Sequence, residues 1–216
     1  SPPDHAGLDA LLQQYVNRNG EVNYAGFKSD QAKLQAYLDL LANNPIQNSW
    51  SRGEKMAYWI NAYNAFTIQL ILDNYPLKSI VDLDNGKVWD RKWIALGNKT
   101  YSLNQIEHEI LRPQYKDARI HFAVNCAAAS CPPLLNKAWT ADNLETNLRK
   151  QTKQFINNPS YNAIGANQIE ISKIFEWYKD DFGNIINYLN KYSDTKIKED
   201  ATVSFREYDW ALNNRK

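Results

Sequence analysis

The sequence predicts an α+β fold: a single domain of helices packed on a small antiparallel or mixed sheet, with one central buried helix. The first observation is size and composition, because 216 residues with 44% apolar and 23% charged side chains suit one soluble globular domain, here 1–216. The second is the order of elements, which runs from helices to short strands to a mixture of both, without the regular alternation of a doubly wound sheet. The third is the segment 51–75, whose apolar residues cover nearly all sides of a helix, as expected in the middle of a protein.

The first 76 residues are expected to contain a loose lead-in, two amphipathic helices and the buried helix. Apolar residues recur at helical spacing in each helix, and breaks fall at Asn19-Gly20, Pro45 and Pro76. In chain order the expected segments are 1–6 (lead-in), 8–16 (helix), 22–27 (extended), 34–41 (helix) and 51–75 (buried helix). Asn61 and Asn64 lie on the buried helix, where polar groups need partners, so they are candidate binding residues.

The rest of the chain is expected to mix short strands, hairpins and helices. Gly97-Asn98 and Gly165-Ala166-Asn167 have the composition of hairpin turns. Ser102-Leu103-Asn104-Gln105 has the form of a capping box that begins a helix. In chain order we expect strands within 78–101, a helix over 103–112, a strand over 120–125, a helix over 140–157, a hairpin over 161–171, short helices over 174–181 and 185–192, and a strand over 203–208.

The most informative stretch is 119–134, which holds both cysteines, Cys126 and Cys131, and one of the three histidines. It opens with the alternation of a strand and then breaks into a turn of small residues closed by Pro132 and Pro133. If that turn begins helically, its free backbone N–H groups would favour a thiolate at Cys126 and supply an oxyanion hole. Cys131 precedes a proline, which has no N–H, so Cys126 is the favoured nucleophile.

Three alternatives compete with a reactive thiol. The two cysteines are close enough in sequence for a disulfide across the turn, and Cys126 continues the apolar face of the expected strand, as a plain core cysteine would. The third alternative is a zinc site formed by both cysteines with His108 or His121. Their spacing matches no standard zinc module, so no metal is expected.

A buried acid–base group is expected on the helix over 103–112. At about 100° per residue, Glu107 falls within its apolar face and His108 lies at the edge. A buried carboxylate needs a partner, so Glu107 is either an acid–base or orienting group or a structural carboxylate bonded to backbone amides or an arginine. His121 is expected on the strand face opposite Cys126, where it would pair with Asn125 on its own face or with Cys131 across the turn; a structural histidine is the favoured interpretation.

Charge and motifs exclude several classes. The formal charge of +1 gives no basic stripe for nucleic acid, and no apolar run is long enough for a transmembrane segment. The chain has no glycine-rich phosphate loop, no Gly-x-Ser-x-Gly elbow and no His-Glu-x-x-His, so no cofactor is expected. It starts Ser1-Pro2-Pro3 without Met, which fits removal of an upstream segment.

Five stretches together resemble the family catalogued as domain of unknown function 547. They span about residues 50–212 and include Ile106-Glu107-His108-Glu109-Ile110-Leu111-Arg112 and Ser130-Cys131-Pro132-Pro133-Leu134; the full set is 54–64, 102–112, 121–134, 173–182 and 208–210. The resemblance implies no established activity. It implies a periplasmic or secreted location, because bacterial members are often exported, and an interaction role, because plant members combine the domain with coiled coils.

Two functional hypotheses follow. The first is a thiol-dependent hydrolase or acyl transferase acting on a small molecule or peptide, with Cys126 as nucleophile, His108 as its activator, and Glu107 or Asp209 as orienter. It rests on residue types reminiscent of thiol hydrolases and transglutaminases. The second is a non-enzymatic exported binding or scaffold domain with a protein partner, in which the Cys, Glu and His residues form a structural network. A disulfide would favour the second.

Overall fold

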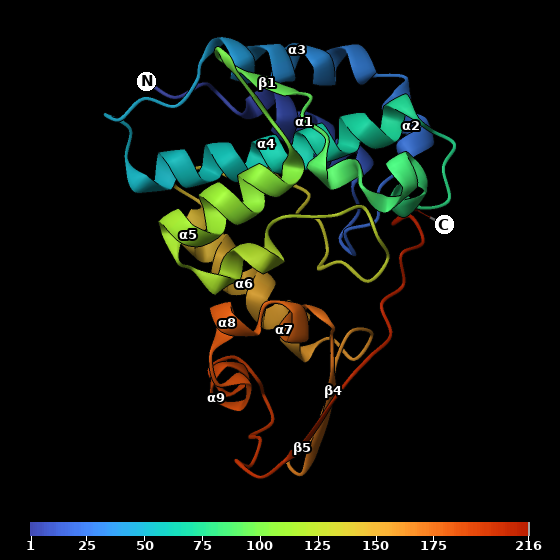
Figure 1. Cartoon of the computed structure of the whole chain (residues 1–216), viewed down its shortest axis with the longest axis vertical. Helices are drawn as coiled ribbons and strands as arrows, with labels where there is room; N and C mark the ends of the chain where they lie inside the picture. The colour runs from blue at the N-terminus through green and yellow to red at the C-terminus, as the bar shows by residue number, and fades with distance from the viewer. Residues whose placement is uncertain (216) are drawn as a thin grey trace.

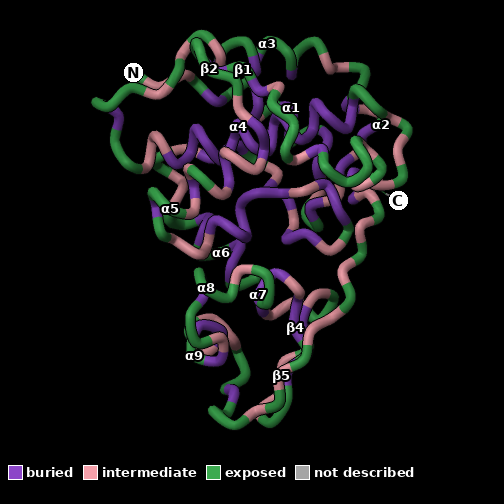
Figure 2. Tube along the Cα trace, viewed as in Figure 1, coloured by how far each residue is buried: buried purple, intermediate pink, exposed green. Residues whose placement is uncertain are grey.

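The buried helix α4, Arg52–Asp73, lies at the centre of the structure, a computed structural model that describes residues 1–215. Every residue from Met56 to Leu72 is buried, and Figure 2 shows this run crossing the wider part of the molecule. Its start is fixed by a capping box, in which Ser51 Oγ accepts from Glu54 N and Glu54 Oε1 accepts from Ser51 N. The expected buried helix is confirmed.

The other elements surround α4, and the α+β class is confirmed with 49% helix and 10% strand. Figure 1 shows a wider part built on the early helices and a narrower end built on the late ones. The α-helices are α1 Ala6–Tyr15, α2 Tyr24–Lys28, α3 Gln31–Asn43, α5 Arg112–Tyr115, α6 Leu144–Asn157, α7 Ile174–Trp177, α8 Lys179–Phe182 and α9 Ile185–Asn190. The 3-10 helices are η1 Ile80–Gly86, η2 Val88–Asp90 and η4 Ala118–Phe122, and the strands are β1 Ile94–Leu96, β2 Lys99–Tyr101, β3 Ala163–Ile164, β4 Gln168–Ile171 and β5 Thr202–Phe205.

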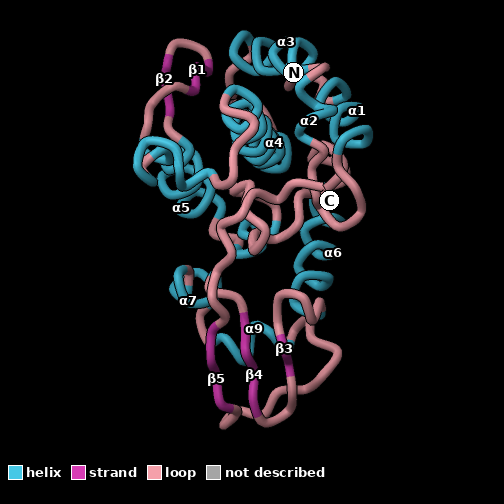
Figure 3. Tube along the Cα trace, turned by 90° about the vertical axis from the view of Figure 1, so that its right-hand side faces the viewer, coloured by secondary structure: helices cyan, strands magenta, loops and turns pink. Residues whose placement is uncertain are grey.

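Two small sheets lie at opposite ends of the molecule (Figure 3). β1 and β2 form the expected hairpin about Gly97-Asn98. In the other sheet β4 pairs antiparallel with β3 and parallel with β5, which makes it the expected mixed sheet. None of the helices in residues 1–215 combines the length and apolarity needed to cross a membrane.

Two segments expected to be extended are not. The piece at 22–27 is not extended, because Asn23 Oδ1 accepts from Gly26 N and begins the short helix α2. The stretch 120–125 is not a strand but the end of η4 followed by irregular backbone. All six residues of 120–125 are buried, and a short apolar run does not distinguish a strand from a buried irregular loop.

The helix that carries Glu107 is a π-helix, η3, Gln105–Leu111, which continues into α5. The expected capping box is confirmed, since Ser102 Oγ accepts from Gln105 N and Gln105 Oε1 accepts from Ser102 N. The helix does not stop at Pro113 as expected. Arg112 N donates to Glu107 O, five residues back, and this wider turn accommodates the proline that follows. π-helices are rare and occur frequently at functional sites.

Amide side chains hold the loop that carries the cysteines. Asn64, on α4, accepts from Asn125 N at 2.9 Å and donates to Ala123 O at 3.0 Å. The Asn125 side chain in turn accepts from Ala127 N at 2.9 Å and donates to Pro132 O at 3.1 Å. Asn64 and Asn125 are only 4% and 5% exposed. These bonds replace the ladder that a strand would have provided.

Removal of the Asn64 amide should therefore destabilise the whole domain. Asn64→Ala leaves a buried N–H and a buried C=O without partners, and we expect a loss of about 2–4 kcal/mol in the free energy of unfolding. Urea denaturation measures this change. Asn187→Ala, at an exposed position on α9, is the control and should change stability by less than about 0.5 kcal/mol. Equal effects of the two substitutions would contradict the role given to Asn64.

Candidate functional site

A pocket of about 280 Å³ lies between the two hydrophobic clusters of the protein. Five of the residues singled out from the sequence line it, namely Glu107, His108, His121, Cys126 and Cys131. A larger groove of about 820 Å³ lies on the other side of the cysteine loop, but no histidine is among the residues that line it. The smaller pocket is therefore the candidate site.

Glu107 is the buried acid of the pocket. It is 6% exposed, and its carboxylate lies between two imidazoles, with Oε1 3.9 Å from His108 Nε2 and Oε2 3.9 Å from His121 Nδ1. The hydroxyls of Tyr63 and Tyr178 are its other neighbours. Burial raises the pKa of both tyrosines, and the negative charge of Glu107 raises both further. Both phenols stay protonated and provide hydrogen-bond donors beside the carboxylate.

His121 belongs to a histidine–acid pair that the sequence did not reveal. Its Nε2 lies 2.7 Å from Asp181 Oδ2, and its ring stacks on Tyr178 with 4.0 Å between centroids. The hydrogen bond from His121, opposed by burial and reinforced by Arg112, lowers the pKa of Asp181 far below its usual range. The ionised carboxylate can only accept, so Nε2 carries the proton and Nδ1 faces Glu107.

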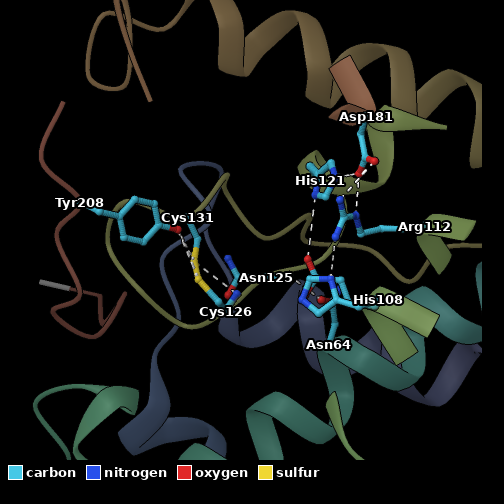
Figure 4. Close-up of polar contacts among 10 residues, drawn as sticks. Asn64, His108, Arg112, His121, Asn125, Cys126, Cys131, Asp181 and Tyr208 are labelled. Atoms are coloured by element: carbon cyan, nitrogen blue, oxygen red, sulfur yellow. Dashed lines mark hydrogen bonds and ion pairs between the residues drawn. A yellow bond between two sulfur atoms is a disulfide. The ribbon is translucent and has the colours of Figure 1, made fainter. Parts of the chain in front are cut away.

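His108 presents its other ring nitrogen, Nε2, to Glu107. Arg112 Nη1 lies 2.9 Å from His108 Nδ1, while the same guanidinium binds Asp181 through Nε at 2.6 Å. An arginine has no acceptor, so Nδ1 of His108 accepts, and a neutral His108 carries its proton on Nε2, which faces Glu107. Each imidazole thus presents one ring nitrogen to the Glu107 carboxylate. Figure 4 shows Arg112 with His108, His121 and Asp181 around it.

Cys126 and Cys131 form a disulfide, so neither sulfur is a thiolate in this form. The Tyr208 hydroxyl lies 3.4 Å from Cys126 Sγ and 3.2 Å from Cys131 Sγ, and among residues 1–215 it is the only side chain that hydrogen-bonds to them (Figure 4). Cys126 is half-buried and Cys131 is buried. Ala127, the residue after Cys126, has φ +64°, a left-handed conformation that costs an alanine about 1–2 kcal/mol. Such strain is typical of functional sites.

Three residues proposed from the sequence lie outside the pocket. The Asn61 amide donates to Trp139 O and accepts from Trp139 N, at 2.7 and 2.9 Å. Asn64 holds the cysteine loop, as described above. Asp209 is exposed, and its carboxylate accepts from Ala211 N. Each of these side chains has a local structural task.

The rim of the pocket and the ion pair next to it include residues that sequence analysis missed. Asp181 lies 60 residues from His121, and four aromatic residues on distant segments form the rim: Trp89, Trp177, Tyr208 and Trp210. The stretches 173–182 and 208–210 belong to the family resemblance, which was the one available signal. Within residues 1–215 no group of three or more His, Cys, Asp or Glu side chains has the arrangement of a metal site.

A family model described as "Protein of unknown function, DUF547" matches residues 47–156, which is half of the chain. The matched range contains α4, η3 and the cysteine loop. It includes the rim residue Trp89 but ends before Tyr178, Asp181 and the other rim residues, Trp177, Tyr208 and Trp210. Comparison with curated proteins and with solved structures finds no match.

The His121–Asp181–Arg112 contacts predict a pH-dependent contribution to stability. Because the folded-state pKa of Asp181 lies below the ordinary value of 3.8, the contribution is complete well above pH 3.8 and is lost as the pH falls toward the folded-state pKa. Asp181→Asn should therefore lower the urea midpoint at pH 7, and the gap to the wild type should narrow below about pH 4.

Asp180→Asn is the matched control, because Asp180 is the exposed neighbour and its carboxylate has no hydrogen bond or ion pair within the described chain. It should leave the urea midpoint unchanged at both pH values. A wild-type to Asp181→Asn gap that is constant with pH would contradict the assignment.

Proposed function

Because the chain belongs to the DUF547 family, whose description assigns no activity, we propose from the pocket itself that the domain is a thiol-dependent hydrolase or acyl transferase. Cys126 is the nucleophile once the disulfide is reduced. The observation that carries this proposal is the convergence of Cys126, His121 and Glu107 on one small pocket, although they come from three different structural segments.

The first step requires a thiol reductant. Two electrons from an external dithiol reduce the disulfide, yield two thiols and leave the dithiol oxidised. The Cys126 thiol then gives its proton to His121 Nδ1, and the thiolate attacks an acyl carbonyl to form a thioester. The imidazolium returns the proton to the leaving amine or alkoxide. Water or an acceptor amine then attacks the thioester and regenerates the thiol.

In this proposal His121, rather than His108, is the base. Asp181 holds the Nε2–H of His121 at 2.7 Å, which fixes the tautomer with an unprotonated Nδ1 on the side of Glu107. Glu107, 3.9 Å from that nitrogen, stabilises the imidazolium that forms. His108 already accepts a hydrogen bond from Arg112, so its Nδ1 is not free to take a proton. His108 then acts through Glu107 as a positioning residue.

The disulfide supports a second candidate function, a binding or scaffold domain without activity. A disulfide persists in an oxidising compartment, so in this case the domain is periplasmic or secreted. The bond between Cys126 and Cys131 then closes the loop permanently, and the pocket binds a small molecule or a protein partner. The two functions differ in whether a free Cys126 has unusual reactivity.

Cys131→Ser tests the enzymatic proposal, because it leaves Cys126 permanently free. With p-nitrophenyl acetate as a generic acyl donor, we expect an acetyl group on Cys126, located by mass spectrometry, without added reductant. The acylation rate should fall at least about tenfold in Cys131→Ser/His121→Asn, which lacks the base. Cys126→Ser is the control and should not be acylated at this position. Equal rates in the single and double variants would support the binding domain instead.

A further inference from the structure

We infer that the pocket binds a methylated ammonium group, so that its ligand is an organic cation such as a choline-type molecule or a trimethylated lysine side chain. The inference that this ligand is the substrate rests on the proposed function. The binding of the ligand does not require a free thiol. Two features carry it: an aromatic rim at the mouth and a buried carboxylate behind it.

The rim consists of aromatic rings from three separate segments. Trp177 and Tyr208 are 4.7 Å apart between ring centroids, and Tyr208 and Trp210 are also 4.7 Å apart. Trp89 packs against Trp210 at 5.7 Å with the rings inclined by 62°. Trp177 is 45% exposed, although large apolar residues are usually covered. Faces of aromatic rings are electron-rich and attract cations, with tryptophan the strongest.

The charges around the pocket complement a cation. No lysine or arginine is among the residues that line it, and the lining carboxylate is that of Glu107, which is 6% exposed. Arg112 lies behind this wall and is neutralised by its two contacts with Asp181, at 2.6 and 3.2 Å. The basic side chains that share the pocket with this carboxylate are the two imidazoles, so a ligand with a permanent positive charge complements it better than a neutral or anionic one.

The aromatic rim favours a methylated ammonium over a primary one. A primary ammonium has three N–H donors and needs an acceptor for each when it is desolvated. The aromatic rim offers ring faces, and Glu107 is the one carboxylate among the lining residues. A quaternary ammonium has no N–H and satisfies its charge with ring faces and one carboxylate. The volume of about 280 Å³ suits such a head group and is small for a drug-sized ligand.

The test compares choline with 3,3-dimethylbutanol, a neutral molecule of the same shape, on the wild-type protein in its disulfide form. Tryptophan fluorescence and calorimetry report binding. We expect choline to bind at least about tenfold more tightly than the neutral isostere. Equal affinities, or no binding of choline, would overturn the inference. A peptide containing trimethyl-lysine is the second arm, and the tighter of the two cations identifies the source of the ammonium group.

Two glutamate variants localise the effect. Glu107→Gln should weaken choline binding at least about tenfold and leave the neutral isostere unchanged. Glu109→Gln, at an exposed position on the same π-helix, removes the same charge outside the pocket and should change affinity less than about twofold. Equal losses in both variants would overturn the assignment to Glu107. The comparison of choline with its isostere on the wild type stands even if Glu107→Gln does not fold.

The outcomes separate this inference from the proposed function. Choline binding without acylation of Cys126 supports the cation pocket and rejects the thiol enzyme. Acylation of Cys126 without choline binding supports the enzyme and rejects the cation pocket.

Discussion

The amide of Asn64 is the contact on which the candidate site depends. It joins the buried helix α4 to the cysteine loop through one accepted and one donated hydrogen bond, at 2.9 and 3.0 Å. The loop has no strand ladder of its own, so its backbone groups are satisfied by Asn64 and Asn125 and by the C-terminal segment, where Ala129 N donates to Ala211 O. The rigid core thereby fixes Cys126 and the strained Ala127 beside it.

Local patterns in the sequence predicted most of the fold. The segment 51–75 was recognisable as a buried helix because its apolar residues cover all sides, and Ser102 with Gln105 marked the start of the next helix. The cysteine loop was not predictable in the same way. Alternation of apolar residues arises both in a half-buried strand and in an irregular loop buried on two sides, and the difference lies in the partner, the distant Asn64.

The site was predictable only in part, for a similar reason. Glu107 stood out because a carboxylate on an apolar helical face needs a partner, whereas the partner of His121, Asp181, is 60 residues away and left no local signal. The expected strand placed His121 on the face opposite Cys126. With that strand absent, η4 and the loop bring both residues to the lining of one pocket. The rim likewise combines η2, α7 and the C-terminal segment.

We therefore propose that Cys126 and His121 form one chemical unit, held by α4 on one side and by Asp181 on the other. The most direct test is an ultraviolet titration of the Cys126 thiolate in Cys131→Ser, compared with Cys131→Ser/His121→Asn. A coupled pair predicts a midpoint below the value of about 8.5 for a free cysteine, and a rise of that midpoint when His121 is removed. A midpoint at or above about 8.5 that does not respond to His121 would contradict the coupling.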